Sequence, residues 1–505
     1  MSNTKLRWLG LGLVSTAGAG VLSLTAIMNS AFAYGDAADP DPSVVGLVMG
    51  GSGTPIPGTD YVEQANNLYL GPTLGTSYPD DYPGVLATSG LVTPEGLYPI
   101  TGVHTLELNY PTDTTPGQLL TGFPNSSTSV GQGLTILYNQ IQADIAAGQT
   151  SDVFGYSQSS TISSLEMQLL DPSGTPSTDP VNFLLVGDPS NPNGGLLERF
   201  DGATLLNGTT INDQLNLPSM GVSFDGATPA NDFATTIYTA EYDGFADYPQ
   251  YPLNFLSDLN AVLGIDTIHG TYLDLTSQQV TPVADGGDAI LLPGSALDGT
   301  TDSLTNYYLI PETAPLVSLL PKPLQELLGP DLTYLINLGY GDGATGYSTG
   351  PADVPTPFGL FPDVSLHSIL STLLTDTEQG FHDLISGTDP YAAALDPATV
   401  ADHAAGLAAF SLPSLTEIIN ALSGATSAAY STLLPLADIA NSLFTSLPAY
   451  DLSLFTDSLG SGNLIDALGL PIAADVGLAT LAGGFAVESI TNSLSQIVGD
   501  FAGLF

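Results

Sequence analysis

The chain has 505 residues and a formal net charge of −47, with 4 lysines and arginines against 51 aspartates and glutamates. A surface this acidic repels nucleic acid and anionic headgroups, so we expect no nucleic-acid partner. The sequence has no cysteine, which excludes disulfides, thiol catalysis and cysteine-ligated metals. A hydrophobic content of 43% indicates a folded protein with a large core rather than a disordered acidic chain.

Residues 1–33 have the pattern of an export signal. Lys5 and Arg7 precede an apolar run from Leu9 to Met28, which closes on Ala31-Phe32-Ala33, a cleavage site of the small-X-small kind. The run is long for a signal peptide, so an uncleaved membrane anchor is the alternative. We expect cleavage after Ala33 and a protein that is secreted or held in the cell envelope.

The next part of the chain alternates between strand and helix patterns. Val44–Met49 is a near-continuous apolar run, as a strand buried on both faces would be, and it ends in a glycine-rich turn. Such a turn can present backbone amides to an anion; phosphate binding is the rival interpretation, although no lysine follows. Further helix and strand patterns occur at residues 61–70, 131–147, 153–156, 181–187 and 234–240. The alternation predicts an α/β fold with a mainly parallel central sheet.

Two domains are expected after the signal, at residues 34–364 and 365–505. The second is rich in Ala, Leu and Ser, with apolar residues at helical spacing. It is predicted to be helical and to cover the first domain or pack on itself; attachment to lipid or to the cell envelope is the alternative. Residues 285–330 are expected to form either a lid or a packed excursion.

A strand, a sharp turn and a helix are predicted around Ser157. An apolar run ends in the Gly-X-Ser-X-Ser motif that begins at Gly155, and a helical pattern follows. A serine on such a turn projects its hydroxyl from the sheet edge, where the amide of the next residue, Gln158, can donate to an oxyanion. Ser157 is therefore the candidate nucleophile. The alternative is a serine-rich helix start whose hydroxyls cap backbone amides.

The chain has five histidines, so the general base can be sought by elimination. The order required in this hydrolase architecture is serine, acid, histidine. His269 follows an acidic loop and is the best candidate for the base. The other four either precede the serine or lie on helical patterns of the C-terminal region: His104, His367, His382 and His403.

Two carboxylates compete for the position behind His269. Asp243 directly follows the β run at residues 234–240, and Asp247 lies one turn later. We favour Asp243, because a residue at a strand end is held rigidly and Gly244 lets the backbone turn there. Asp188 is expected to stabilise its own turn. The scattered histidines indicate no metal site, and this chemistry needs no cofactor.

Several motifs, in order, resemble the PE-PPE domain of mycobacterial serine α/β-hydrolases, which are similar to cutinases. The resemblance covers roughly residues 44–363 and rests on Met49–Pro55, Gly155–Ser159, Gly187–Pro189, Asn191–Gly195, Tyr242–Gly244, His269–Tyr272 and Asn337–Gly341. It implies an exported esterase or lipase in which Ser157 is the nucleophile and His269 the base. By the same resemblance, Gly51, Ser52 and the amide of Gln158 would form the oxyanion hole.

The predicted function is hydrolysis of acyl esters of lipids or glycolipids through an acyl-enzyme. An acyltransferase that moves acyl chains onto a cell-envelope glycolipid, such as a trehalose ester, is the alternative within enzymes. From another class comes a non-catalytic envelope or adhesion protein. The expected partner is a lipid or glycolipid ester, and we also expect peripheral association with the envelope or membrane.

Overall fold

The computed structural model describes residues 44–52, 54, 57–74, 88–91, 129–200, 216–217, 222–224, 226–299, 303–320, 322–341, 343–347, 359–386, 420, 424, 433 and 435–502. The expected signal segment, His104 and His403 lie outside these residues.

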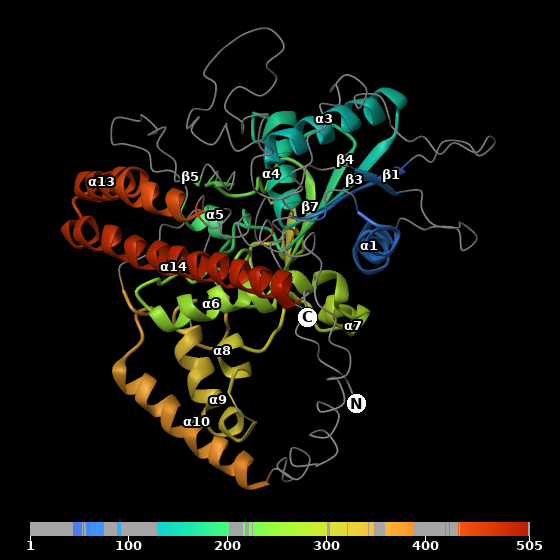
Figure 1. Cartoon of the computed structure of the whole chain (residues 1–505). Coiled ribbons are helices and arrows are strands. Elements are labelled where there is room, and N and C mark those ends of the chain that lie inside the picture. Colours follow the sequence, from blue (N-terminus) through green and yellow to red (C-terminus); the bar gives the residue numbers. More distant parts are fainter. Residues whose placement is uncertain are drawn as a thin grey trace.

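A seven-stranded sheet in the order β2-β1-β3-β4-β7-β9-β8 forms the centre of the molecule (Figure 1). Neighbouring strands are parallel except for β8, which runs antiparallel to β9. The strands are β1 (Val44–Met49), β2 (Thr88–Leu91), β3 (Thr150–Tyr156), β4 (Val181–Val186), β7 (Ala234–Ala240), β8 (Ile290–Leu291) and β9 (Thr305–Ile310). The predicted α/β fold with a mainly parallel sheet is confirmed.

Helices cover both faces of this sheet, which is why its strands are apolar almost throughout. On one face, Leu47 and Met49 of β1 pack in one hydrophobic cluster with α3 (Ser129–Ala147) and α4 (Gln158–Leu170). On the other face, Val48 packs in a second cluster with α1 (Thr59–Ala65) and the π-helical segment η1 (Asn66–Leu70). Successive residues of one strand therefore serve two separate cores.

The order of the strands fixes where the site forms. The chain passes from β1 to β2 on one side and then returns to place β3 on the other side of β1. At such a reversal the loops that leave the carboxyl ends of the two strands diverge and open a crevice. Here those loops carry Gly51 and Ser157.

Residues 285–330, expected to form a lid or a packed excursion, contribute strands to the sheet. They contain β8 and β9, so the lid interpretation is wrong for these strands. The run Tyr307–Ile310 is buried, with Tyr307 and Leu309 in one core and Tyr308 and Ile310 in the other. The apolar run of β9 is shorter than that at Val44–Met49, and periodicity alone does not distinguish so short a run from a buried helix segment.

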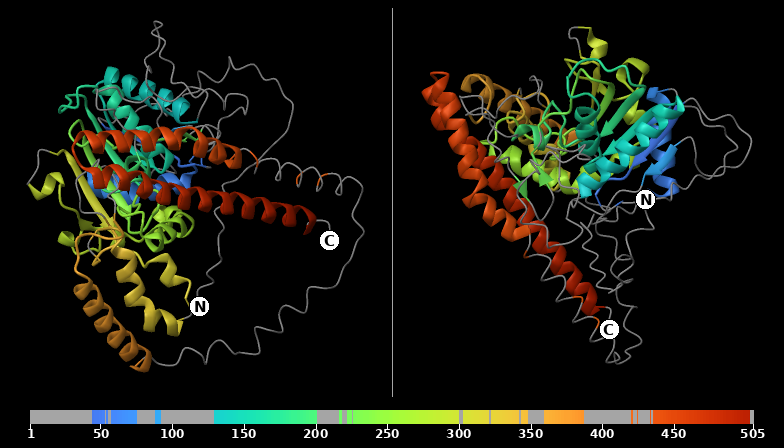
Figure 2. Two further views of the ribbon diagram at one scale, coloured as in Figure 1. Left: turned by 90° about the vertical axis from the view of Figure 1, so that its left-hand side faces the viewer. Right: turned by 90° about the horizontal axis from the view of Figure 1, so that it is seen from above.

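The described parts of the C-terminal region are helical, as predicted, and they pack on the rest of the molecule. Helix α10 (Leu366–Ser386) lies against α9 (Lys322–Asn337), and α13 (Ser446–Gly460) and α14 (Leu464–Ala502) pair as a hairpin (Figure 2). Helix α14 lies along α6 (Phe255–Thr267). The shorter elements are α2 (Gly71–Leu74), α5 (Leu196–Arg199), β5 (Asn216–Leu217), β6 (Val222–Ser223), η2 (His269–Asp274), α7 (Ser277–Val280), η3 (Val283–Asp285), η4 (Ala296–Asp298) and α8 (Pro315–Ser318).

Candidate active site

Ser157 occupies the turn between β3 and α4 in a backbone conformation that few L-residues adopt, with φ 58° and ψ −120°. Its amide donates to the Val186 carbonyl at 3.1 Å, and its carbonyl accepts from the Ser160 amide at 2.9 Å. Gly155 is required here, because a Cβ added to it would lie 2.8 Å from the Ser159 carbonyl oxygen. Such local strain persists only where the surroundings enforce it, and it is typical of a nucleophile turn.

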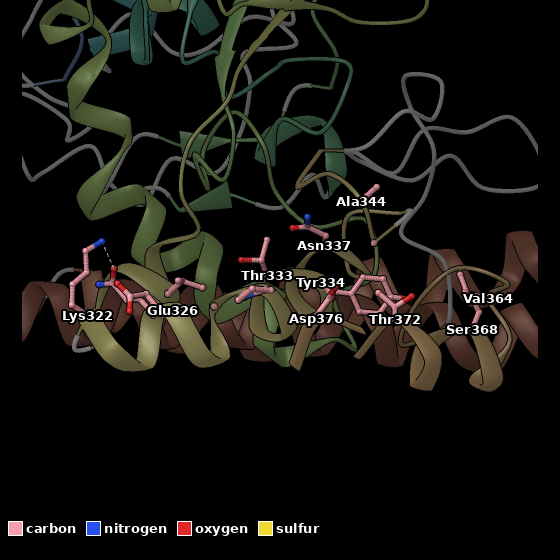
Figure 3. A pocket seen from close by; sticks show the side chains of 15 residues that line it. Lys322, Glu326, Thr333, Tyr334, Asn337, Ala344, Val364, Ser368, Thr372 and Asp376 are labelled. Atoms are coloured by element: carbon pink, nitrogen blue, oxygen red, sulfur yellow. Dashed lines mark hydrogen bonds between the residues drawn. The ribbon is translucent and has the colours of Figure 1, made fainter. Parts of the chain in front are cut away.

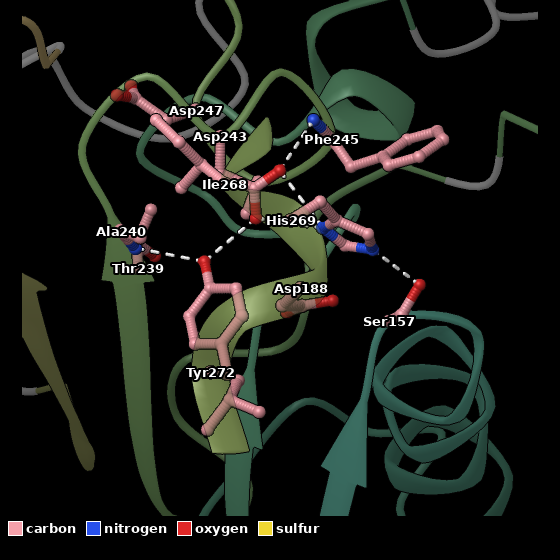
Figure 4. A network of polar contacts seen from close by, with 12 residues as sticks. Ser157, Asp188, Thr239, Ala240, Asp243, Phe245, Asp247, Ile268, His269 and Tyr272 are labelled. Atoms are coloured by element: carbon pink, nitrogen blue, oxygen red, sulfur yellow. Dashed lines mark hydrogen bonds and ion pairs between the residues drawn. The ribbon is translucent and has the colours of Figure 1, made fainter. Parts of the chain in front are cut away.

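His269 is the first residue of the 3-10 helix η2, directly after α6. Its Nε2 lies 2.7 Å from Ser157 Oγ, and its Nδ1 lies 2.9 Å and 2.8 Å from the two carboxylate oxygens of Asp243 (Figure 4). The structure thus brings together three side chains that lie far apart in the sequence. Their spacing is that of a hydroxyl that can give its proton to an imidazole whose orientation is fixed by a carboxylate.

The carboxylate of Asp243 is fully buried and accepts two further hydrogen bonds. The Phe245 amide donates to Oδ1 at 3.1 Å, and the Tyr272 hydroxyl donates to Oδ2 at 2.8 Å. That hydroxyl in turn accepts from the Ala240 amide at 2.8 Å. Burial, reinforced by the charge of Asp243, raises the pKa of Tyr272, so this phenol keeps the proton that it donates. These two donors fix the orientation of the buried carboxylate behind the imidazole.

Asp247, the alternative acid, lies elsewhere. Its carboxylate is buried and accepts from the Tyr242 amide at 2.9 Å. Burial raises the pKa of Asp247 well above its usual range, although the Tyr242 amide and the charge of Arg199 act in the other direction. Figure 4 shows its side chain directed away from the imidazole. Asp247 therefore supports the turn that presents Asp243.

The turn that presents Asp243 does not depend on Gly244 as expected. The residue with positive φ in this turn is Tyr242, at 67°, and not Gly244. Gly244 serves a different purpose: a Cβ there would lie 2.1 Å from the Ala261 carbonyl oxygen of α6. The glycine permits the close approach of α6, and the strained tyrosine makes the turn.

Aromatic residues that the sequence reasoning missed surround the imidazole. The Tyr156 hydroxyl donates to the His269 backbone carbonyl. The Phe245 ring lies at an angle to the imidazole, with 4.7 Å between the centroids. Tyr272 follows His269 by three residues, and in a 3-10 helix such residues share a side. That spacing, within the motif His269–Tyr272, is a signal in the sequence that could have pointed to Tyr272.

The loop after β4 leaves room for the imidazole. Gly187 has φ 55°, and a Cβ added to it would lie 3.2 Å from His269 Cε1 and 2.8 Å from the Tyr272 ring. Asp188 stabilises this turn, since it accepts from the Ser190 amide at 3.0 Å and from the Thr228 hydroxyl at 2.7 Å. Burial raises the pKa of Asp188 to about 6, against the effect of both hydrogen bonds.

Of the three residues expected to form an oxyanion hole, Gly51 and Gln158 border Ser157, and Ser52 follows Gly51 in the same loop. A Cβ added to Gly51 would lie 3.3 Å from Ser157 Cβ and 3.1 Å from the Tyr156 carbonyl oxygen, so the loop after β1 lies against the turn. The Ser52 hydroxyl is buried and has no hydrogen-bond partner within the described part of the chain. Gln158 is the first residue of α4, where the helix dipole is positive.

A separate groove of about 840 Å³ lies between α9 and α10 (Figure 3). Its lining includes Asn337 but none of the three side chains joined through His269. Asn337 accepts a hydrogen bond from the Tyr242 hydroxyl at 2.8 Å, so one wall of the groove supports the turn before Asp243. In the described residues there is no cluster of three or more acidic or histidine side chains that could hold a metal ion.

Comparison with known proteins places these observations in a family. The model of the PE-PPE domain matches residues 87–341, about half of the chain. The chain belongs to the PE-PPE domain family. The resemblance predicted from the sequence motifs is thereby confirmed, and the matched PE-PPE region includes Ser157, Asp243 and His269.

Three relatives of this PE-PPE domain protein come from Mycobacterium tuberculosis. The uncharacterized PPE family protein PPE28 is 40% identical over 93% of this chain and 69% of the relative. Esterase PE16 is 40% identical over 63% of this chain and 51% of the relative. The uncharacterized PPE family protein PPE42 is 34% identical over 68% and 52%. The chain thus spans about half the length of two of these relatives, and no solved structure matches it.

Proposed function

We propose that this protein is a serine carboxyl-ester hydrolase that acts on acyl esters of lipids or glycolipids outside the cytoplasm. One observation carries the proposal: the hydrogen-bonded series Ser157 Oγ, His269 and Asp243, with separations of 2.7 Å and 2.8 Å. Two further observations support it. The family is that of the relative named Esterase PE16, and Ser157 has the strained backbone of a nucleophile turn.

In the acylation half-reaction, Ser157 Oγ attacks the ester carbonyl carbon while its proton passes to His269 Nε2. Nδ1–H of the imidazole donates to Asp243, which fixes the tautomer and stabilises the imidazolium. The carbonyl oxygen becomes an oxyanion. As the tetrahedral intermediate collapses, the bond to the alcohol oxygen breaks, and that oxygen leaves with the proton from Nε2.

In the deacylation half-reaction, water attacks the acyl-enzyme and gives a proton to Nε2. The second intermediate collapses to the free acid, and Ser157 Oγ recovers its proton. We assign stabilisation of both oxyanions to the amides of Gln158 and Gly51, which border the nucleophile, and to the buried Ser52 hydroxyl, which follows in the same loop. Donors of this kind contribute about 10²–10³ in turnover each.

An active-site-directed fluorophosphonate tests the nucleophile. We expect one label per chain, attached to Ser157 in the peptide map, and no label after Ser157→Ala. Ser163→Ala is the matched control, because Ser163 lies buried on the same helix and its hydroxyl donates to the Ser159 carbonyl. Labelling that survives Ser157→Ala, with circular dichroism showing a folded variant, would contradict the assignment.

The same residues would serve transfer of the acyl group to a sugar, so the product decides between the two reactions. We expect free acid when a lipid ester is offered with or without trehalose, as measured by mass spectrometry. Acylated trehalose as the main product would make the protein a transferase.

The proposed export is read from the N-terminus of protein recovered outside the cytoplasm, which we expect at Tyr34.

A further inference from the structure

Helix α14 reaches the reacting groups through two aromatic rings. Phe485 stacks on Phe245 with 6.0 Å between centroids, and Phe245 contacts the imidazole of His269 with 4.7 Å between centroids. Phe485 and Phe245 belong to the hydrophobic cluster that joins the hairpin to α5 and α6. The inner side of the hairpin is therefore part of the wall around the proposed triad.

This inner side fits closely on the hydrolase fold. The Tyr248 hydroxyl donates to the Gly477 carbonyl at 3.0 Å. A Cβ added to Gly477 would lie 2.7 Å from Pro252 Cβ, and one added to Gly484 would lie 2.5 Å from Val262 Cγ1. Glycines at these two positions let α14 approach the loop before α6 and α6 itself more closely than any other residue would allow.

The outer side of α14 is apolar along most of its length. Six aliphatic side chains there are between 43% and 71% exposed: Leu464, Ile465, Leu468, Ile472, Val487 and Ile490. At about 100° of rotation per residue, Ile465, Leu468, Ile472, Val487 and Ile490 lie on one arc of the helix. The positions between them on this arc are alanine, glycine or valine. A Cβ added to Gly483, on this arc, would meet no atom within 4 Å. The result is an exposed apolar stripe roughly 38 Å long, with the partly exposed Asp475 at its edge.

Length and composition alone would allow Leu464–Thr491 to cross a membrane, since its mean hydropathy is 1.6. However, a third of its most apolar window is buried in the protein, and its glycines hold it against the hydrolase fold. A helix fixed on one side and apolar on the other suits the plane of a lipid interface rather than a span. Residues 435–502 contain no lysine or arginine, so anionic headgroups would not be attracted.

We propose that the outer face of α14 is the surface by which the protein rests on a lipid interface of neutral or zwitterionic headgroups. This inference depends on the proposed function, because it assumes that the ester substrate is embedded in that interface. The occupant is lipid rather than another protein for two reasons. The stripe consists of aliphatic side chains, alanine and glycine and has none of the aromatic residues, methionine or arginine that are enriched in protein interfaces. The same helix also contacts the residues that would act on a lipid ester.

Tryptophan quenching tests the contact directly, because Trp8 is the only native tryptophan. In a Trp8→Phe background, Ile472→Trp reports on the stripe, and Leu370→Trp on the exposed face of α10 is the matched control. With vesicles of phosphatidylcholine brominated on the acyl chains, we expect strong quenching of the first variant and none of the second. Equal quenching of both, or quenching of the control alone, would overturn the proposal. So would fluorescence of the first variant that responds to protein concentration and not to vesicles.

Turnover separates this proposal from the proposed function. Ile465→Ser combined with Ile472→Ser is expected to lower hydrolysis of a long-chain ester in phosphatidylcholine vesicles by about tenfold or more, because two aliphatic side chains no longer enter the lipid. Hydrolysis of a water-soluble butyrate ester should not change. Unchanged turnover in vesicles would refute the lipid contact. If the unaltered chain hydrolyses neither ester while Ile472→Trp is still quenched, the proposed function fails and the lipid contact stands.

Discussion

Replacing the acid behind His269 gives the sharpest test of the proposed triad. In Asp243→Asn, one of the two oxygens that lie 2.8–2.9 Å from Nδ1 becomes an amide nitrogen. If this NH₂ group faces Nδ1, the imidazole must carry its proton on Nε2. That nitrogen then donates to Ser157 and cannot accept the hydroxyl proton. We expect turnover to fall by about 10⁴ for this reason.

Asp247→Asn is the matched control, since it makes the same chemical change four residues away. The new side-chain oxygen can still accept from the Tyr242 amide, which lies 2.9 Å from Asp247 Oδ2, and the side chain is directed away from His269 (Figure 4). Turnover should therefore fall by about tenfold at most. The assay is kcat/KM on a soluble butyrate ester, with circular dichroism to show that both variants fold. A larger loss from Asp247→Asn, or small equal losses from both, would refute the assignment of Asp243.

Three other changes test the supports of the site. Tyr272→Phe leaves the buried Ala240 amide without its acceptor and should lower the free energy of unfolding by about 1–3 kcal/mol in urea titrations. Gly51→Ala would put a methyl group 3.3 Å from Ser157 Cβ, so kcat should fall while fluorescence-detected unfolding stays nearly unchanged. Burial raises the pKa of Glu166 from 4.5 to about 9. Between these two pH values the folded state keeps a proton that the unfolded chain releases, so the free energy of unfolding falls as pH rises. Glu166→Gln should remove this loss, and its advantage over the unaltered chain in urea titrations should grow by about 1.4 kcal/mol per pH unit between about pH 5 and pH 8.

What the sequence could predict was local. The turn at Ser157 could be predicted from consecutive residues, because glycine, serine and a following helix pattern are needed within one short segment. The strand at residues 44–49 could be predicted in the same way from its unbroken apolar run. By contrast, the choice between Asp243 and Asp247 depended on the positive φ of Tyr242. Tyrosine seldom adopts this conformation, so the sequence does not predict it.

Contacts between distant segments were beyond such reasoning. The hydrogen bond from Tyr272 to Asp243 joins residues 29 positions apart, and the stacking of Phe485 on Phe245 joins residues far more distant. Composition showed that the C-terminal region was helical and apolar. It could not show which side of α14 would be buried. The buried side has Gly477 and Gly484 and the exposed side has the apolar stripe, so neither side is distinctly polar.

Ser159, which stands where this kind of turn usually has its second glycine, shows how a departure from a motif can be accommodated. The residue is fully buried, and its hydroxyl accepts from the Tyr156 amide at 2.8 Å. It has one hydrogen to donate, either to the Met49 carbonyl at 3.3 Å or to the Tyr156 carbonyl at 3.0 Å. Met49 ends β1 just before Gly51, so the serine can link the nucleophile turn to the loop proposed for the oxyanion. A glycine would allow the same close packing but would leave the Tyr156 amide without this acceptor.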